Sequence, residues 1–346
     1  MARKRISTLG QNFMKDAGWL RTPPRSEKAA ISDLRSYAKK GFHRDLIKRN
    51  IDWLAKRCRD YRYYFQSPLP SLAIKDGLNE EEKIVLYNLY TSTRFRGIDN
   101  FRNLSSWDSC PYCGLRNPVT LDHYLPRRIQ DFPHLSYFSL NLVPSCSDCQ
   151  FKKSTFVPAT LAIRNLRGKK RFGSKQMLPR PASTQLGHRS RSRITNCNRM
   201  IHPYFDRQVK VDEILINFDF DTTVGPINFR VALKGSHRSS EGRLISFHFN
   251  KLEMAERLVH PLRREWDSLI PYLNVALNGK IPESSNVKQL LKAQSAKAKS
   301  KLGLFSMEAK FLESVANNKD CIALLIQKIA PPKRNVPKNR RHGSPV

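Results

Sequence analysis

The sequence predicts an α+β protein whose small central core lies between a helical region and a mixed region of one hairpin and several helices. Three observations predict it: two C-x-x-C pairs in mid-chain, apolar residues at helical spacing on either side, and period-two alternation near residue 220. With 346 residues, the chain suits roughly two or three modest domains. The expected regions are a basic arm (1–24), a helical lead-in (25–104), the core (105–160), a basic loop (161–200), a mixed α/β accessory region (201–330) and a disordered basic tail (331–346).

The charge balance predicts a polyanionic partner. The chain has 62 Lys and Arg residues against 29 Asp and Glu residues, a formal net charge of +33. Such a field concentrates nucleic acid and drives sequence-independent phosphate binding through counterion release. A membrane surface would serve the same charge, but the sequence has no amphipathic membrane helix, no lipidation site and no apolar run of about 18 residues. The basic start has no apolar stretch behind it, so we expect no secretory signal and a cytoplasmic protein.

The region before the cysteine pairs reads as an arm followed by three helices. The arm ends in Thr-Pro-Pro at 22–24, a combination that blocks both helix and sheet. Helical patterning follows over 26–40 and again over 46–65. A third helix fits 79–90, where Asn79 can cap the helix and three glutamates occupy the first turn, as the helix dipole prefers.

Two patterns follow the core. Residues 164–200 are rich in Arg and Lys, which predicts an exposed loop that either lies along a phosphate backbone or merely keeps the protein soluble. Apolar and polar residues then alternate on both sides of Gly225-Pro226, which predicts a hairpin of strands 214–220 and 227–233. Apolar residues at helical intervals predict three further helices: 243–270, ending before Pro271, then 287–302 and 306–329.

The cysteines predict a structural metal site. Of the 7 cysteines, four form two C-x-x-C pairs, Cys110 with Cys113 and Cys146 with Cys149. Each pair can bite a metal from one turn, and four thiolates suit tetrahedral Zn²⁺ with no position left open for substrate. Chance pairs or a redox dithiol are the alternatives. The other three cysteines, Cys58, Cys197 and Cys321, are expected to be small buried apolar residues.

Between the two cysteine pairs stands Asp122-His123, which supplies the ingredients of phosphodiester hydrolysis. A carboxylate can hold a hard cation, and an imidazole can accept a proton near neutral pH. A single histidine is more often a core or surface residue without chemistry. From spacing alone the two readings are equally open.

These elements together resemble the HNH, or ββα-metal, endonuclease family: Asp122-His123, then Asn141 in LNLVP, then CSDCQFKKS, with C-x-x-C flanks. The resemblance implies that His123 is the general base, that Asn141 braces the loop carrying the histidine, and that Asp122 holds a catalytic Mg²⁺ or Mn²⁺. The family's last metal-binding position, usually Asn or His, is Gln150 here, and its extra methylene displaces the ligating oxygen. The implied fold is a zinc-bound ββα core.

The same resemblance implies a mechanism. His123 would deprotonate a water in line with the scissile bond, while a divalent ion on Asp122 and Gln150 stabilises the charge on the phosphorus oxygens, leaving 5′ phosphate and 3′ hydroxyl. Four basic residues are expected to bind flanking phosphates of DNA: Arg127, Arg128, Lys152 and Lys153. The alternative is that they form an ordinary solvated basic face.

A further string, HPYFD at 202–206, resembles an element of a bacterial HNH subgroup associated with phage defence, including nuclease partners of ATPases in Septu-like systems. The resemblance implies a role in bacterial defence and an ATPase partner. His202 and Asp206 either make a second polar contact to the active site or cap and pack it. Two other functions stay open: an RNA-directed nuclease, because nothing reads the sugar, and a catalytically weak nucleic-acid-binding zinc module.

Overall fold

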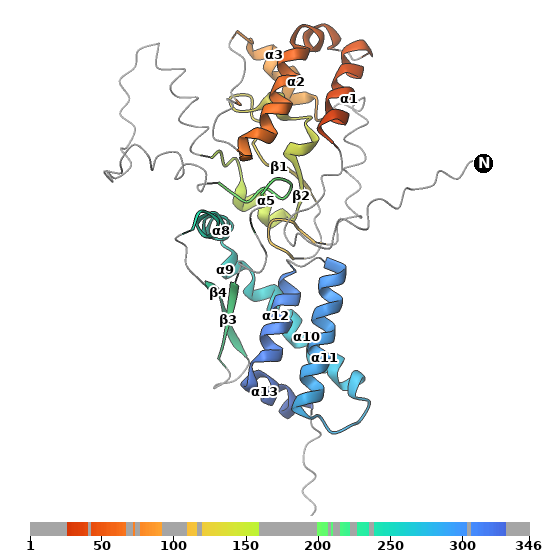
Figure 1. Ribbon diagram of the computed structural model, residues 1–346, viewed down its shortest axis with the longest axis vertical. Coiled ribbons are helices and arrows are strands. Elements are labelled where there is room, and N and C mark those ends of the chain that lie inside the picture. The colour runs from red at the N-terminus through yellow and green to blue at the C-terminus, as the bar shows by residue number, and fades with distance from the viewer. Residues whose placement is uncertain are drawn as a thin grey trace, which may run out of the picture.

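A computed structural model describes residues 26–40, 43–66, 72, 77–91, 109–115, 120–158, 199–206, 209, 215–221, 227–234, 239–302 and 306–329. The fold of these residues is mixed and mostly helical, with two small two-stranded antiparallel sheets. The expected basic arm, basic tail and all but the last two residues of the basic loop lie outside the described residues, as does Cys197. Figure 1 shows the N-terminal helices at the top, the hairpin-and-helix core in the middle and the C-terminal helices below.

The N-terminal region contains the three expected helices, α1 (Glu27–Lys40), α2 (Arg44–Gln66) and α3 (Glu80–Asn88). Helix α1 packs along α2, and both bury an apolar stripe on the central core. The Asn79 side chain accepts a hydrogen bond from the backbone N–H of Glu82, whose carboxylate accepts one from the backbone N–H of Asn79. This reciprocal capping confirms the predicted start of the helix.

The central core is a short hairpin followed by a short helix. Strand β1 (Thr120–His123) pairs antiparallel with β2 (Leu142–Ser145), in a register that places His123 opposite Leu142, and α5 (Ser147–Lys153) follows directly. The connection between the strands contains two 3₁₀ turns, η3 (Pro133–Leu135) and η4 (Ser139–Asn141). Two strands of this length are marginal by themselves, so the core depends on what surrounds it.

The predicted second hairpin is confirmed as β3 (Leu215–Asp221) and β4 (Asn228–Lys234). The predicted helix over 243–270 was wrong in two ways. It is broken into α8 (Ser240–Lys251), α9 (Met254–Arg257) and α10 (Val259–Leu277), and α10 continues past Pro271. Glu253, in a left-handed conformation with φ of 51°, makes the break. Burial of Leu269, Leu273 and Leu277 on one face holds the helix together across the proline, although the proline ring removes one backbone hydrogen bond.

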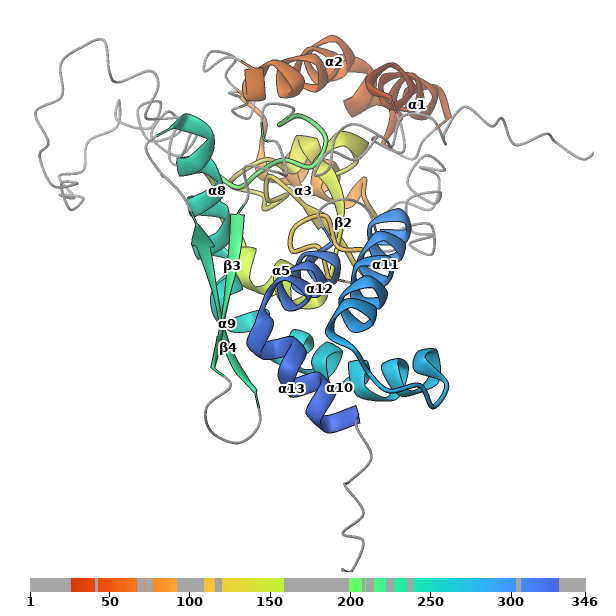
Figure 2. The ribbon, with the colours of Figure 1, turned by 60° about the horizontal axis from the view of Figure 1, so that its bottom comes forward.

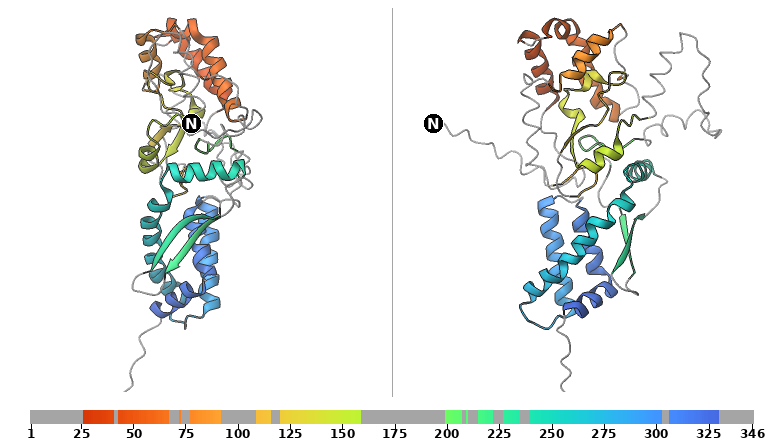
Figure 3. Two further views of the ribbon diagram at one scale, coloured as in Figure 1. Left: turned by 90° about the vertical axis from the view of Figure 1, so that its left-hand side faces the viewer. Right: turned by 180° about the vertical axis from the view of Figure 1, so that it is seen from behind.

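The last three helices are α11 (Ser284–Leu302), α12 (Met307–Asn317) and α13 (Lys319–Ile329). The single helix predicted over 306–329 was wrong, because Asn318 interrupts it: its extended backbone ends α12 and its side chain accepts from the N–H of Cys321. Figure 2 shows β3 and β4 beside α12 and α13, and Figure 3 shows this part below the ββα core from two sides.

The apolar side chains of all these parts form one continuous core. Cys58 and Cys321 are both fully buried within it, as predicted, and Trp266 is its largest member. Among the helices that the structure describes, none combines the length and apolarity needed to cross a bilayer.

Candidate functional site

The four paired cysteines come together as one cluster that could hold a metal ion. Their sulfur atoms all lie within 4.8 Å of one another. The first pair sits in a tight turn closed by Gly114, whose φ of 69° favours glycine, and the second pair begins α5. The backbone N–H of Cys146 also donates to the sulfur of Cys110, 3.4 Å away. Four sulfur ligands in this arrangement are typical of structural Zn²⁺.

His123 lies at the end of β1 with one ring nitrogen engaged. Its Nε2 is 2.9 Å from the carbonyl oxygen of Ser136, and a carbonyl can only accept, so Nε2 carries the proton. The neutral ring therefore presents Nδ1 as a proton acceptor. Burial lowers the pKa of His123 to about 3, and the nearby Arg127 and Lys153 charges add to the effect against the opposing hydrogen bond to Ser136. At physiological pH the ring is therefore neutral and can accept a proton, but a pKa this far below the operating pH makes it a weak general base.

The ring of His123 packs against the turn that follows α3. The Tyr90 ring stands edge-on to it, with centroids 4.7 Å apart. Arg127, in turn, lies over the rings of Tyr87 and Tyr90, at 4.1 and 4.8 Å, and donates to the Tyr87 carbonyl. The guanidinium of Arg127 thus anchors the aromatic wall of the site, a position that the spacing of basic residues did not predict.

Asp122 points away from His123, because successive side chains of a strand alternate between its faces. Its carboxylate is 4% exposed and accepts hydrogen bonds from the hydroxyl of Tyr112 at 2.9 Å and from Nζ of Lys153 at 3.1 Å. Burial raises the pKa of Asp122, while Lys153 and Tyr112 oppose that shift. Asp122 is thus an internal ion-pair partner rather than an open ligand.

Lys153 corrects one expectation. Its side chain is 1% exposed, and Nζ donates to Asp122 and to the backbone carbonyls of His123 and Ser154, at 2.7 and 3.3 Å for the carbonyls. The prediction that Lys153 grips a phosphate is therefore wrong. The last turn of α5 faces the hairpin, and the buried carboxylate of Asp122 draws the ammonium inward.

The other predicted contacts stay at the surface. Arg128 pairs with Asp131, and Lys152 pairs with Glu253 of the turn before α9. Gln150 lies half-buried on α5, next to the strongly exposed Phe151. Contacts of Arg127, Arg128 and Lys152 with nucleic acid remain predictions.

Asn141 holds the loop that follows His123. Its Oδ1 accepts from the N–H of Leu125 at 2.8 Å, and its Nδ2 donates to the carbonyls of Leu125 and Leu135 at 3.0 and 3.3 Å. The hydroxyl of Tyr61, on α2, also donates to Oδ1, at 2.9 Å. These contacts match the bracing role that the resemblance implies.

Replacement of Asn141 by alanine should destabilise the protein by roughly 3 kcal/mol, since the N–H and carbonyl of Leu125 and the hydroxyl of Tyr61 would lose a buried partner. Urea unfolding measures the loss, and Asn250→Ala, at an exposed position of α8, is the control and should change stability by less than about 0.5 kcal/mol. Equal stability of the two variants would contradict the bracing role.

The HPYFD element supports the loop that follows His123 through contacts with Tyr61 and Leu140. Nδ1 of the fully buried His202 accepts from the N–H of Tyr204, so its proton sits on Nε2, which faces the Tyr61 hydroxyl at 3.1 Å and the carbonyl of Leu140. Burial lowers the pKa of His202 well below its usual range, which keeps the ring neutral. Asp206 forms a two-pronged ion pair with Arg199, at 2.5 and 2.6 Å. Of the two expected roles, capping and packing agree with these contacts.

Several residues of the site carried no sequence signal. Tyr61 and Tyr90 touch the predicted site residues Asn141 and His123 from segments far away in the sequence. Tyr112, between the cysteines of the first pair, donates to Asp122. Arg257 reaches the sulfur atoms of Cys146 and Cys149 from α9. Tyrosine occurs both at surfaces and in cores, and arginine is usually a surface residue, so only the three-dimensional structure identifies these partners.

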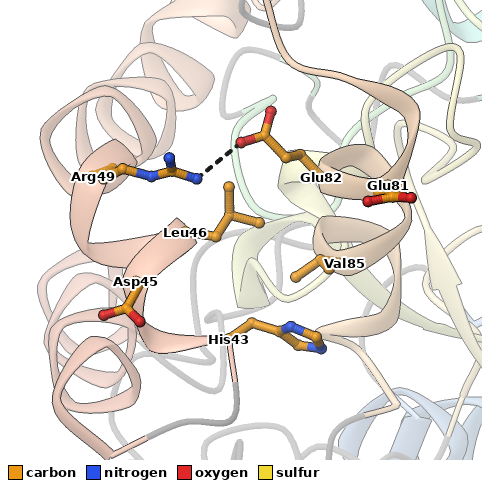
Figure 4. A pocket seen from close by; sticks show the side chains of 7 residues that line it. All are labelled: His43, Asp45, Leu46, Arg49, Glu81, Glu82 and Val85. Carbon is orange, nitrogen blue, oxygen red and sulfur yellow. Dashed lines mark hydrogen bonds and ion pairs between the residues drawn. The ribbon is translucent and has the colours of Figure 1, made fainter.

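A shallow pocket of about 280 Å³ lies elsewhere, between the start of α2 and α3. Figure 4 shows its polar side chains, with Arg49 paired to Glu82. None of the predicted site residues lines it, so it adds nothing to the chemistry at His123.

The comparisons with known proteins give one relative. The chain is 26% identical over 156 residues to "Protein ea31" of Escherichia phage lambda. The match covers 44% of this chain and 40% of the phage protein, so the chain spans less than half of that relative's length. No protein-family model matches the sequence. No solved structure matches it either.

Proposed function

We propose that the protein is a nuclease that hydrolyses DNA phosphodiester bonds with His123 as general base. The observation that carries the proposal is the hydrogen bond from Nε2 of His123 to the Ser136 carbonyl, which leaves Nδ1 to accept a proton. The hairpin and helix around it, the four-cysteine cluster and the net charge of +33 support a nucleic-acid substrate. The HPYFD resemblance extends the proposal to bacterial defence, with an ATPase as partner.

The chain's own contribution to the reaction is proton transfer and positioning. His123 Nδ1 takes a proton from a water as that water attacks phosphorus, and the bond between phosphorus and the 3′ oxygen breaks. The leaving 3′ oxygen takes a proton from solvent to become the 3′ hydroxyl, and the Ser136 carbonyl stabilises the imidazolium through Nε2. The Tyr90 ring and the Asn141 brace fix the imidazole and its loop. Such a positioned base contributes about 10²–10⁴-fold to a rate.

The catalytic Mg²⁺ or Mn²⁺ that the resemblance implies does not fit the Asp122 carboxylate in this arrangement. That carboxylate is buried, and its oxygens face the ammonium of Lys153 and the hydroxyl of Tyr112. A cation beside Lys153 would meet a like charge. Gln150 alone offers one neutral oxygen, which is too little to hold a divalent ion without a carboxylate.

The test is cleavage of supercoiled plasmid by zinc-loaded protein. We expect His123→Ala to lower the rate by about 10²–10⁴-fold, whereas His260→Ala, at an exposed position of α10, should leave it unchanged. Zinc content is measured in both variants, so that loss of the metal is not mistaken for loss of the base. Cleavage by His123→Ala at the wild-type rate would refute the mechanism.

Adding divalent ions tests whether Asp122 is a ligand of a catalytic ion or only the buried partner of Lys153. If cleavage requires Mg²⁺ or Mn²⁺ and Asp122→Asn abolishes that metal-dependent cleavage, Asp122 leaves Lys153 to bind the ion. If cleavage proceeds in dialysed buffer at constant zinc content, the arrangement seen here is the active one. Single-stranded RNA of matched length, tested in parallel, distinguishes the RNA-directed alternative.

A second candidate function is nucleic-acid binding without cleavage. The specific observation in its favour is the ion pair of Asp122 with Lys153, which withdraws the expected metal ligand. Salt-dependent retention of DNA, with no product across several divalent ions, would favour this reading.

A further inference from the structure

The turn around α9 reaches the second cysteine pair through one arginine. The guanidinium of Arg257 donates to the sulfur of Cys149 at 3.5 and 3.6 Å and to that of Cys146 at 3.8 Å. A hydrogen bond to the carbonyl of Leu252, at 2.9 Å, fixes its orientation. The side chain is 13% exposed, so these contacts are largely shielded from water.

The same segment holds the cysteine cluster at two other points. Nε2 of His248, on α8, donates to the carbonyl of Tyr112 in the turn of the first cysteine pair, at 2.7 Å. Glu253 forms an ion pair with Lys152 on α5. Figure 1 shows α8 and α9 below α5 and to its left. Residues 239–257, which we call the clasp, therefore contact both cysteine pairs.

The chemistry of the cluster explains why a guanidinium suits this position. Four thiolates around a divalent ion leave a net charge of about −2, and that charge is costly in a buried site. Arginine remains protonated and offers several donors in a fixed plane, so it can serve two sulfur atoms together. Lysine at this position would offer the charge from a single atom.

We propose that Arg257 is a positioning residue of the metal centre: it neutralises thiolate charge on Cys146 and Cys149 and thereby couples metal binding to docking of the clasp. The proposal concerns the four-cysteine centre and is independent of whether the protein cleaves nucleic acid. A metal-bound cluster attracts the guanidinium, and the docked guanidinium strengthens metal binding by the same free energy, because coupling is reciprocal.

The competing explanation is an ordinary ion pair. Arg257 lies 3.6 Å from Asp148, but that carboxylate is 73% exposed, so the pair is worth little. The two roles make different demands. An ion pair with Asp148 predicts that loss of either partner has the same effect, whereas contact with thiolates predicts that only loss of Arg257 weakens metal binding.

The test measures metal affinity by competition between the full-length protein and a chromophoric zinc chelator. Arg257→Ala should bind Zn²⁺ about 10- to 100-fold more weakly, the usual effect of losing a group that hydrogen-bonds a ligand. Arg257→Lys should lie between this variant and wild type. Asp148→Ala and Arg264→Ala, the latter at an exposed position of α10, should show no loss of affinity.

Two further measurements distinguish a changed metal centre from misfolding of the variants. In the Co²⁺-loaded protein, Arg257→Ala and Arg257→Lys should shift the thiolate-to-metal charge-transfer band, because the hydrogen bonds to sulfur change. Hydrogen exchange should show that removing the metal from wild type lowers protection in α8 and α9 more than in α13. Wild-type affinity and an unshifted band in both Arg257 variants would overturn the proposal, as would equal losses of affinity in Asp148→Ala and Arg257→Ala.

Discussion

Removing the metal from the four-cysteine centre should unfold the hairpin and α5 while leaving α10 to α13 helical. The strands β1 and β2 contain 4 residues each and α5 contains 7, too few to be stable without a metal that links the two cysteine pairs. Structural zinc contributes about 10–16 kcal/mol in zinc-finger peptides, comparable to the whole stability of an ordinary domain. The C-terminal helices bury leucines of their own, among them Leu273, Leu291 and Leu312, so we expect them to keep their helical structure without the metal.

The measurement is hydrogen exchange with and without a strong chelator, after metal analysis has shown about one zinc per chain. Protection should disappear across β1, β2 and α5. Cys113→Ala should behave like the chelated protein, while Cys321→Ala, which changes a buried cysteine of α13, should keep its zinc. A metal-free protein with unchanged exchange and circular dichroism would contradict the structural role.

The sequence predicted best where the signal was local. The spacing of each C-x-x-C pair brings two sulfur atoms into one turn, so each half of the cluster follows from the chain's short-range geometry. The cap at Asn79 and the alternating strands of the second hairpin are local signals of the same kind. The cysteine pairs, the Asn79 cap and the second hairpin agree with the predictions because each depends on residues close together in the sequence.

Prediction failed where distant residues decide the outcome. A lysine near the end of a helix usually lies in water, and only the buried carboxylate of Asp122, on another element, explains why Lys153 does not. The left-handed Glu253 that separates α8 from α9 has no signal comparable to glycine. Asn318, by contrast, is of a residue type that often caps the start of a helix, so the sequence did hold a signal for the break between α12 and α13.

Replacement of Lys153 by methionine should destabilise the protein by about 3–5 kcal/mol. Methionine fills a similar volume without the ammonium, so Asp122 would keep a buried charge with only the Tyr112 hydroxyl as partner. Removal of one member of a buried pair costs more than the pair itself contributes, because the remaining charge is stranded. Unfolding in urea, monitored at constant zinc content, measures the difference.

The neighbouring lysine is a matched control. Lys152→Met removes an ion pair with Glu253 whose side chains are 31% and 46% exposed, so it should cost less than about 1 kcal/mol. Adding Asp122→Asn to Lys153→Met should restore part of the stability, because the stranded charge is then gone. Equal effects of the two lysine substitutions would mean that Lys153 faces solvent, and its expected contact with phosphate would then return as the better explanation. If the buried pair is confirmed, any divalent ion at Asp122 must first displace Lys153, which ties metal binding to a rearrangement of the last turn of α5.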